Sequence, residues 1–571
     1  MWVGCWGTTV FGLETNVMVF ELGEENSDLS GAGGCEPCQV DESEGDSGAE
    51  SVEVSRRGFL KLAGFGAAVG ATVGVSGGCD ADLGLVAKNP SGGGGWLPDQ
   101  YNASGNFPVQ VRGRVPIDPT NPSIKRDDQK CILCGQCVEV CSKVETVMHN
   151  YELPLIDDIP CVCCGQCTLW CPTGAISEVD DTHLLMRAIE DPNLHVVIQT
   201  APSTRVALGE EFGLPVGTNV EGCQVAALNR IGVDKIFDTN FSADLTIMEE
   251  GTELVKRITG EIKTPLPQLT SCCPGWVKFC EYFYPDLIPH LSSAKSPMTM
   301  LGAMIKTYYA EKSNIDPKKI FSVAIMPCTA KKFEAIRPEM NHSGIKNGDP
   351  TIRDIDLVLT TRELAKLIKR VGLDFVNLPP MKYDSLLSEY SGAGAIFGVT
   401  GGVMEAAVRT AYHLLAGEPP KSLLNLEPVR GLAGVKEAKL NIPNVGDVKI
   451  AVVSGLHNSH KILERIRNGS GDWHFVEFMA CPGGCISGGG QPRSAVPPSD
   501  AVRSARINSL YSADEKSTIR LSHENHEIKT IYKDYLGKPN GELPHELLHT
   551  HYTDRSKHLT AKIKKTGSEE K

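Results

Sequence analysis

The stretch Met479-Ala-Cys-Pro-Gly-Gly-Cys-Ile-Ser-Gly-Gly-Gly-Gln491 decides the fold, because it packs two cysteines among glycines and a proline. Two further loops carry cysteine beside proline: Thr270-Ser-Cys-Cys-Pro-Gly-Trp276 and Met326-Pro-Cys-Thr-Ala-Lys-Lys332. The loops supply four thiolates from three distant segments, and such soft donors select iron–sulfur clusters or zinc. Proline and glycine let the backbone turn tightly around a bulky group. The four cysteines are Cys273, Cys328, Cys481 and Cys485.

A second group of cysteines forms two tandem runs, CxxCxxCxxxC over 131–141 and CxxCxxCxxxCP over 161–172. The spacing is typical of ferredoxin-type proteins with two [4Fe–4S] clusters, in which the fourth cysteine of each run binds the other cluster. Zinc ribbons, the alternative, use cysteine pairs instead. We expect one cluster to be held by Cys131, Cys134, Cys137 and Cys171. We expect the other to be held by Cys161, Cys164, Cys167 and Cys141.

Bulk composition excludes several classes of protein. The chain has 571 residues and is 41% hydrophobic, enough for several folded domains. Its net charge of −14 argues against nucleic acid as a partner. The 20 cysteines are clustered rather than spread as in a small secreted disulfide scaffold, which indicates metal binding in a protein assembled under reducing conditions.

The order of patterns along the chain predicts six segments. These are an acidic Gly/Ser-rich extension of disordered composition (1–54), a twin-arginine-like signal segment (55–79), a linker (80–114), a ferredoxin-like domain with two clusters (115–185), a catalytic domain (190–495) and a polar, mostly helical C-terminal region (500–565).

The segment Ser55-Arg-Arg-Gly-Phe-Leu-Lys61 has the form of a twin-arginine export signal. The apolar stretch after it is rich in Gly and Ala and is shorter than the ~20 residues of a membrane span. We therefore expect export of the folded protein to the periplasm or the outer face of the cell membrane, with cytoplasmic location as the alternative and no integral membrane span. The twin arginine lies far from Met1, and Met18 is another candidate start.

Alternating apolar runs predict an α/β catalytic domain with largely parallel sheets and helices on both faces, beside an α+β two-cluster ferredoxin-like domain. Strands are expected at 195–198, 323–326, 395–397 and 449–453. Helices are expected at 243–258, 297–312, 361–371, 403–415 and 460–467. The cysteine loops follow or lie near strand ends, where α/β folds place cofactors.

The three cysteine loops together closely resemble the active-site loops of iron-only ([FeFe]) hydrogenases, and the resemblance spans roughly 115–565. It implies reversible oxidation of H2 to protons and electrons. It also implies that Cys273, Cys328, Cys481 and Cys485 hold a third [4Fe–4S] cluster, bridged through Cys485 to a di-iron unit with CO, cyanide and azadithiolate (the H-cluster). A four-cysteine zinc site or a plain electron-transfer cluster is the alternative.

The same resemblance assigns the residues around this cluster. Lys331 would donate a hydrogen bond to a cyanide ligand. Met326 and Met479 would pack against the di-iron unit. Ala201, Pro202 and Ser203 match a family loop that lines the pocket.

A proton path is also implied by the resemblance, running through Cys272, Glu250, Ser292 and Glu253, with Arg257 near its exit. Cys272 would be a free thiol beside the open iron site. The alternatives are that Cys272 is a buried inert cysteine and that the two glutamates, three apart on one helix, form a solvated face.

Several expectations concern partners and rival functions. We expect an external electron carrier, a ferredoxin or a c-type cytochrome, and maturation enzymes for the di-iron unit; no dinucleotide fingerprint is present. His545-Glu-Leu-Leu-His549 formally matches a zinc-protease motif, but its segment resembles a hydrogenase stretch that is a separate small subunit in some relatives. The rivals are a non-catalytic relative used in iron–sulfur assembly and an H2 sensor.

Overall fold

The computed structural model describes residues 113–151, 159–418, 424–443, 445–493 and 499–559. All of them belong to one compact unit that spans 54–571. The expected acidic extension, the twin-arginine-like segment and nearly all of the expected linker lie outside the described residues. Within the described part of the chain, no helix is long and apolar enough to cross a membrane.

Four parallel strands form the first sheet, in the order β4-β3-β6-β7. Successive residues of a strand point to opposite faces, so the apolar runs bury both faces. Val196 and Ile198 pack with α6, α7 and α14, whereas Val197 packs with α8 and α10. The bounds are β3 His195–Thr200, β4 Lys235–Asp238, β6 Ile320–Met326, β7 Leu357–Thr360, α6 Thr182–Glu190, α7 Glu221–Ile231, α8 Thr239–Ile258, α10 Pro297–Met304 and α14 Thr361–Val371.

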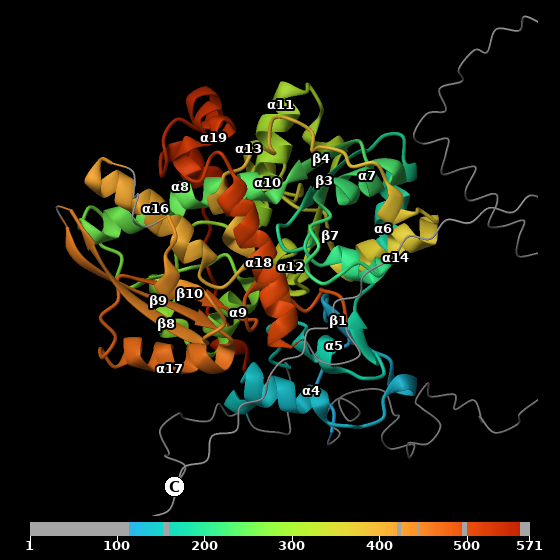
Figure 1. Cartoon of the computed structure of the whole chain (residues 1–571), viewed down its shortest axis with the longest axis horizontal. Coiled ribbons are helices and arrows are strands. Elements are labelled where there is room, and N and C mark those ends of the chain that lie inside the picture. The colour runs from blue at the N-terminus through green and yellow to red at the C-terminus, as the bar shows by residue number, and fades with distance from the viewer. Residues whose placement is uncertain (1–112, 152–158, 419–423, 444, 494–498, 560–571) are drawn as a thin grey trace, which may run out of the picture. The chain divides into compact units, whose positions relative to one another are not determined.

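The second sheet has the order β5-β10-β9-β8, and only β8 runs antiparallel to its neighbour. Ala451 and Val453 face α9 and α17, while Ile450 and Val452 face α16 and α8. Figure 1 shows α16 and α17 along this group of strands. The bounds are β5 Gln268–Leu269, β8 Val435–Ile442, β9 Gly446–Ser454, β10 Phe475–Met479, α9 Pro274–Phe283, α16 Gly402–Ala416 and α17 Leu456–Arg467.

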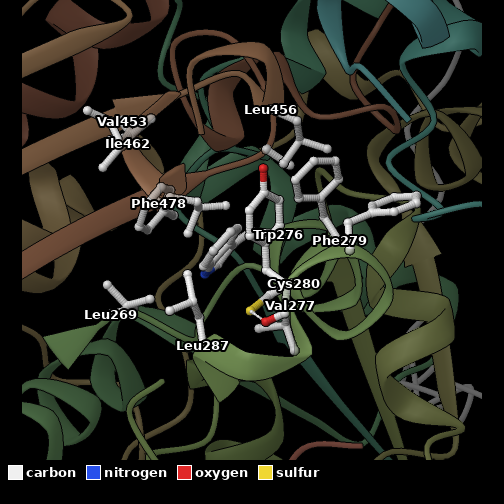
Figure 2. Close-up of a cluster of buried hydrophobic side chains, with 14 of the residues drawn as sticks. Leu269, Trp276, Val277, Phe279, Cys280, Leu287, Val453, Leu456, Ile462 and Phe478 are labelled. Atoms are coloured by element: carbon white, nitrogen blue, oxygen red, sulfur yellow. Dashed lines mark hydrogen bonds between the residues drawn. The ribbon is translucent and has the colours of Figure 1, made fainter. Parts of the chain in front are cut away.

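A tightly packed aromatic cluster fixes the start of α9 (Figure 2). Trp276 is fully buried, stacks on Phe478 with ring centroids 4.1 Å apart, and donates from Nε1 to the Thr270 carbonyl at 2.9 Å. Because Pro274 occupies the first turn of the helix, α9 begins directly after Cys273. The packing of Trp276 therefore determines where Cys273 lies.

Helix α8 is shared by the two sheets. Phe241 and Leu245 pack into the core of the first sheet, and Ala243, Ile247 and Leu254 pack into that of the second. A helix apolar on two sides must be buried along most of its length. Any acidic side chain on α8 therefore sits inside the protein.

The remaining elements are short or belong to the ends of the described chain. Strands β1 and β2 pair antiparallel in the cysteine-rich segment, beside α4 and α5. Helices α18, α19 and α20 form the C-terminal region. The bounds are β1 Ile124–Arg126, β2 Ile176–Glu178, α4 Gln136–Glu139, α5 Gln166–Trp170, α11 Ala310–Lys312, α12 Ala330–Ala335, α13 His342–Lys346, α15 Gly392–Ala395, α18 Asp500–Lys516, α19 His526–Ile531 and α20 Glu542–Leu548.

The predicted fold class is confirmed, with one error among the predicted strands. Residues 395–397 are not a strand: Gly392–Ala395 form α15, and a 3-10 turn follows over Ile396–Gly398. The run holds a single β-branched residue, and the glycines on either side of it, Gly394 and Gly398, allow close packing. A Cβ added at Gly394 would lie 2.6 Å from the Asn240 carbonyl oxygen of α8. Tertiary packing against α8 thus overrides the apolar pattern.

Candidate active site

The carboxyl ends of parallel strands deliver the cysteine loops to one place. Cys272 and Cys273 follow β5, and Cys481 follows the neighbouring strand β10. In the other sheet, Cys328 follows β6, next to the Ala201–Ser203 loop after β3. Ligands in α/β folds bind outside the carboxyl ends of strands, and here two such ends meet.

These loops enclose a cavity of about 80 Å³, and every residue predicted to surround the catalytic cluster lines it. The residues are Ala201, Pro202, Ser203, Cys272, Cys273, Met326, Cys328, Lys331, Met479, Cys481 and Cys485. Four soft thiolate donors in an otherwise largely apolar lining suit a cluster better than zinc, which would draw all four sulfurs to one point. The backbone N–H of Ala480 donates to Cys273 Sγ at 3.4 Å, as cluster thiolates commonly accept.

Lys331 is the one charged side chain among those lining residues. Its ammonium donates to the Cys272 carbonyl at 3.1 Å and to Glu334 Oε2 at 2.6 Å. Burial opposes the charge, but the Glu334 carboxylate outweighs burial and raises the pKa of Lys331. The cavity therefore contains a permanent cation aimed at its wall beside Cys272.

The ferredoxin-type cysteines group as predicted from their spacing. Cys131, Cys134, Cys137 and Cys171 line one cavity of about 20 Å³. Cys141 joins Cys161, Cys164 and Cys167 around a second cavity of about 30 Å³. The fourth cysteine of each run thus lies with the other run, which is the arrangement that two [4Fe–4S] clusters require. Backbone N–H groups of Val115 and Ile176 donate to Cys137 and Cys171 Sγ at 3.4 and 3.5 Å.

The second of these cavities adjoins the catalytic one, and the first reaches the surface. A Cβ added at Gly275 would lie 3.2 Å from Ala480 and 3.8 Å from the Cβ of Cys164. Cys134 is exposed, whereas Cys167 is buried. The three cysteine sets therefore form a series from the surface to the enclosed cavity.

Glycines of the 488–490 run join the catalytic loop to its neighbours. A Cβ at Gly488 would lie 2.3 Å from the Pro327 carbonyl oxygen, and one at Gly489 would lie 2.2 Å from that of Cys164. Arg362 clamps the same run, donating to the Gly489 carbonyl at 2.8 Å and forming a buried ion pair with Glu178 of β2. The sequence predicted tight turning around a cofactor, and the structure shows that the glycines serve close packing between loops.

Gly489→Ala is therefore expected to destabilise the protein by about 1–3 kcal/mol, the usual range for overpacking, and to lower the iron content of the second ferredoxin-type cluster. Thermal unfolding and iron quantification would check this. Gly251→Ala, where the new Cβ meets only Thr410 Cγ2 at 3.9 Å, should instead be neutral or stabilising. Equal iron loss in both variants would contradict the packing argument.

The residues predicted for the proton path lie inside the protein. Glu250 and Glu253 are 1% and 4% exposed, so the alternative that they form a solvated face is wrong. Ser292 Oγ donates to Glu253 Oε2 at 2.8 Å, and Arg257 pairs with Glu253 at 2.5 Å. Among the described residues, neither carboxyl oxygen of Glu250 has a hydrogen-bond partner. Burial, and next the Glu253 charge, raise the pKa of Glu250 to about 8.

Cys272 lines the cavity and also packs against the core of the second sheet. Burial, and next the Glu250 carboxylate, raise the pKa of its thiol. Cys272 and Glu250 are thus close enough to interact electrostatically, and Glu250 interacts in the same way with Glu253. Cys280, in contrast, lies fully buried on α9 and packs in the aromatic core.

Three residues beside this path were not predicted from the sequence. Ser293 Oγ lies 2.8 Å from His549 Nδ1, and His549 Nε2 lies 3.0 Å from Glu249 Oε2. The signals were present: Ser293 and Glu249 each adjoin a predicted path residue, and His549 belongs to the stretch discounted as a protease motif. The sequence gives no sign that the C-terminal region pairs with the loop after Ser292, where Ala294 and His549 form an antiparallel bridge.

The α/β fold and the grouped cysteine thiols are those of a protein that binds iron–sulfur clusters. Comparison with known proteins shows the family to which the chain belongs. Residues 194–489 match the family described as iron only hydrogenase large subunit, C-terminal domain. Residues 500–555 match the family described as iron hydrogenase small subunit. The chain belongs to the iron-only hydrogenases, which are oxidoreductases acting on H2.

Individual relatives agree with this. The chain is 46% identical over 455 residues to the NADP-reducing hydrogenase subunit HndD of Solidesulfovibrio fructosivorans, covering 76% of this chain and 75% of the relative. It is 46% identical over 374 residues to the periplasmic [Fe] hydrogenase large subunit of Nitratidesulfovibrio vulgaris, covering 65% and 86%. A solved variant of [FeFe]-hydrogenase HydA1 from Chlamydomonas reinhardtii is 42% identical, with a TM-score of 0.59, covering 66% and 99%.

Proteins of iron–sulfur assembly, the non-catalytic rival, are more distant relatives. Cytosolic iron-sulfur assembly component 3 of Pongo abelii is 31% identical over 363 residues, covering 62% of this chain. The identities of 46% to named hydrogenases place the chain with the enzymes.

Proposed function

We propose that this protein catalyses the reversible oxidation of H2 to two protons and two electrons at an H-cluster held by Cys273, Cys328, Cys481 and Cys485. The observation that carries the proposal is the cavity in which these four cysteines meet Cys272 and Lys331. When bound, the di-iron unit would supply the open iron position at which H2 is split or formed.

The chain's own residues would enclose and orient that unit. Lys331 is a fixed cation that can donate a hydrogen bond to an anionic diatomic ligand. Met326 and Met479, each 2% exposed, offer soft apolar packing, and Ala201, Pro202 and Ser203 complete the wall. The lining keeps water from the site, which strengthens each of these polar contacts.

Protons would move along Cys272, Glu250, Ser292 and Glu253, with Arg257 at the outer end. Glu250 suits such a relay because an acid with a pKa of about 8 both takes and gives protons near neutral pH. Arg257 holds Glu253 in place and also donates to the carbonyls of Pro265, His290 and Leu291.

Electrons would pass through two [4Fe–4S] clusters in the segment 115–185. The inner one would be held by Cys141, Cys161, Cys164 and Cys167, and the outer one by Cys131, Cys134, Cys137 and Cys171. The exposure of Cys134 supports transfer to an external carrier at this surface, a ferredoxin or a c-type cytochrome.

Two parts of the proposal concern the cell. The twin-arginine-like segment at 55–79, and a relative named as periplasmic, support export to the periplasm of a protein with its cofactors already inserted. Maturation enzymes would supply the di-iron unit before export. The domain limits remain those predicted from the sequence, with 190–495 catalytic and 500–565 small-subunit-like.

The test is an anaerobic assay of protein co-expressed with maturation enzymes. We expect H2-dependent reduction of a viologen dye, H2 evolution from the reduced dye, and infrared bands of iron-bound CO and cyanide. Full iron content and both sets of bands without turnover in either direction would overturn the proposal and leave an H2 sensor or an electron carrier.

A further inference from the structure

Beyond Ser292, Glu253 has a second series of hydrogen-bond contacts, which runs through Ser293 and His549 to Glu249. The Ser293 backbone N–H and hydroxyl lie 3.1 and 3.4 Å from Glu253 Oε2. The same hydroxyl lies 2.8 Å from His549 Nδ1, and His549 Nε2 lies 3.0 Å from Glu249 Oε2. Glu253 is thus connected, through one serine and one imidazole, to a second buried carboxylate.

His549 is held in one orientation by backbone pairing. Ala294 and His549 form an antiparallel bridge, Thr550 N donates to the Ser293 carbonyl at 2.8 Å, and Lys295 N donates to the Leu548 carbonyl at 2.8 Å. The residue is 3% exposed. Its segment belongs to the region that matches the small-subunit family, so this region contributes a side chain next to the proposed proton path.

The contacts of Glu249 decide which imidazole nitrogen carries a proton. Glu249 accepts from the Tyr532 hydroxyl and, at Oε2, from the Asn540 backbone N–H at 2.7 Å. An oxygen that already accepts in this way is an acceptor for His549 as well, so Nε2 is the protonated nitrogen. The charge of the imidazole then depends only on whether Nδ1 is also protonated.

Protonation of His549 Nδ1 decides which acceptor receives the single hydrogen bond that the Ser293 hydroxyl can donate. With Nδ1 unprotonated, the hydroxyl donates to Nδ1, and Glu253 keeps only the donors Ser292, Ser293 N–H and Arg257. With Nδ1 protonated, Nδ1 donates to Ser293 Oγ, and the hydroxyl proton turns to Glu253 Oε2. An additional hydrogen-bond donor and a nearby cation both stabilise the ionised form of Glu253, so its carboxyl group gives up a proton more readily.

We propose that His549 is a positioning residue of the proton path, which sets through the Ser293 hydroxyl how firmly Glu253 holds a proton. The inference rests on the proposed role of Glu253. Histidine changes charge in the range pH 5–8. A charged His549 therefore helps Glu253 release its proton, and a neutral His549 helps Glu253 retain it. The effect is a wider pH range for proton transfer.

The surroundings place this control where the path meets solvent. Glu253, Arg257 and Ser293 line a cavity of about 540 Å³, and the exposed His545 and His551 line it too. The other titratable or charged groups facing this chain of contacts come from α8, α13, the 3-10 turn Pro285–His290 and the C-terminal region: Glu249, Glu250, Lys256, His342, His290, Tyr532, His545, His551 and Tyr552. Within the described part of the chain, the hydrogen-bond partners of the Ser293 hydroxyl are His549 and Glu253.

The test compares His549→Gln with Ser293→Ala. A glutamine amide can still donate to Glu249 and accept from Ser293, so it copies the neutral ring and fixes the hydroxyl away from Glu253. We expect kcat for H2 oxidation to match the wild type at pH 9 and to fall about tenfold to 100-fold at pH 6, the worth of one hydrogen bond to a charged group. Ser293→Ala should show the same loss on the acid side only.

A double variant separates this mechanism from a structural role. If His549 acts through Ser293, the double variant should lose no more activity than the worse single variant. Losses that multiply, a pH profile parallel to the wild type, or a uniform loss that follows the unfolding temperature would overturn the inference. His526→Gln, at a 72% exposed side chain on α19, is the matched control and should behave as wild type.

Glu253→Gln distinguishes the failure of the two proposals. If Glu253→Gln retains full activity, the proposed proton path itself is wrong. If Glu253→Gln is inactive and His549→Gln keeps the wild-type pH profile, only the role of His549 is wrong.

Discussion

Cys272→Ala is expected to lower H2 turnover at least about 100-fold in both directions, the scale of a lost general acid–base group, while leaving iron content and the infrared bands unchanged. The reason is geometric: of the four predicted path residues, only Cys272 lines the cavity, beside Cys273, which is proposed to bind the cluster. Cys272 also interacts electrostatically with Glu250. Viologen reduction under H2, measured with the infrared spectrum of the same sample, checks the prediction.

The matched control is Cys223→Ala. That thiol is half-buried on α7, where it packs against the core of the first sheet and donates to the Leu378 carbonyl, and it lines none of the three cysteine cavities. Its loss removes a thiol without touching the cavity, so activity should remain. Loss of the infrared bands in Cys272→Ala would mean that Cys272 is needed to retain the cluster, and turnover near the wild-type rate would show that protons reach the cavity by another route.

Cysteine spacing was enough to predict how twelve cysteines group around three cavities, because each run and loop has the local pattern of a cluster-binding segment. The exchange of the fourth cysteine between runs appears in the structure as Cys171 lining the first cavity and Cys141 the second. Helices were also predictable where the 3.6-residue pattern was strong: 361–371 coincides with α14, whose capping box begins at Thr360.

What the sequence could not supply was the tertiary setting of each polar residue. Two glutamates three apart on a helix have the pattern of a solvated face, and only the burial of α8 between two sheets makes Glu250 and Glu253 interior groups. The short run at 395–397 looked like a strand because its packing against α8 is not encoded locally. The contacts of His549 could not be predicted for the same reason, since its partners Ser293 and Glu249 are 256 and 300 residues away.

Glu250→Gln is expected to abolish H2 turnover, by at least about 100-fold, and yet to stabilise the fold. Burial, and next the Glu253 charge, raise the pKa of Glu250 from 4.5 to about 8, because Arg257 offsets the cost of its buried carboxylate only in part. The wild type therefore has the full stability of the neutral acid only below about pH 4.5. It loses stability as pH rises through 8, where folding must bury a charge that the unfolded chain leaves in water.

Glutamine stays neutral at every pH, so the variant escapes this loss. Its advantage in unfolding free energy should grow from pH 5 to pH 8, towards a limit on the order of 5 kcal/mol, and then level off. Anaerobic thermal unfolding at pH 5.5 and pH 8 measures this advantage, with the exposed Glu261→Gln as a control that should show neither effect.

Inactivity with a lowered unfolding temperature would mean that glutamine disrupts the site. Activity with raised stability would show that Glu250 is buried for a reason other than proton transfer. Only inactivity together with a pH-dependent gain in stability identifies Glu250 as an acid that serves proton transfer although it lowers the unfolding free energy. A structural acid would instead raise the unfolding free energy.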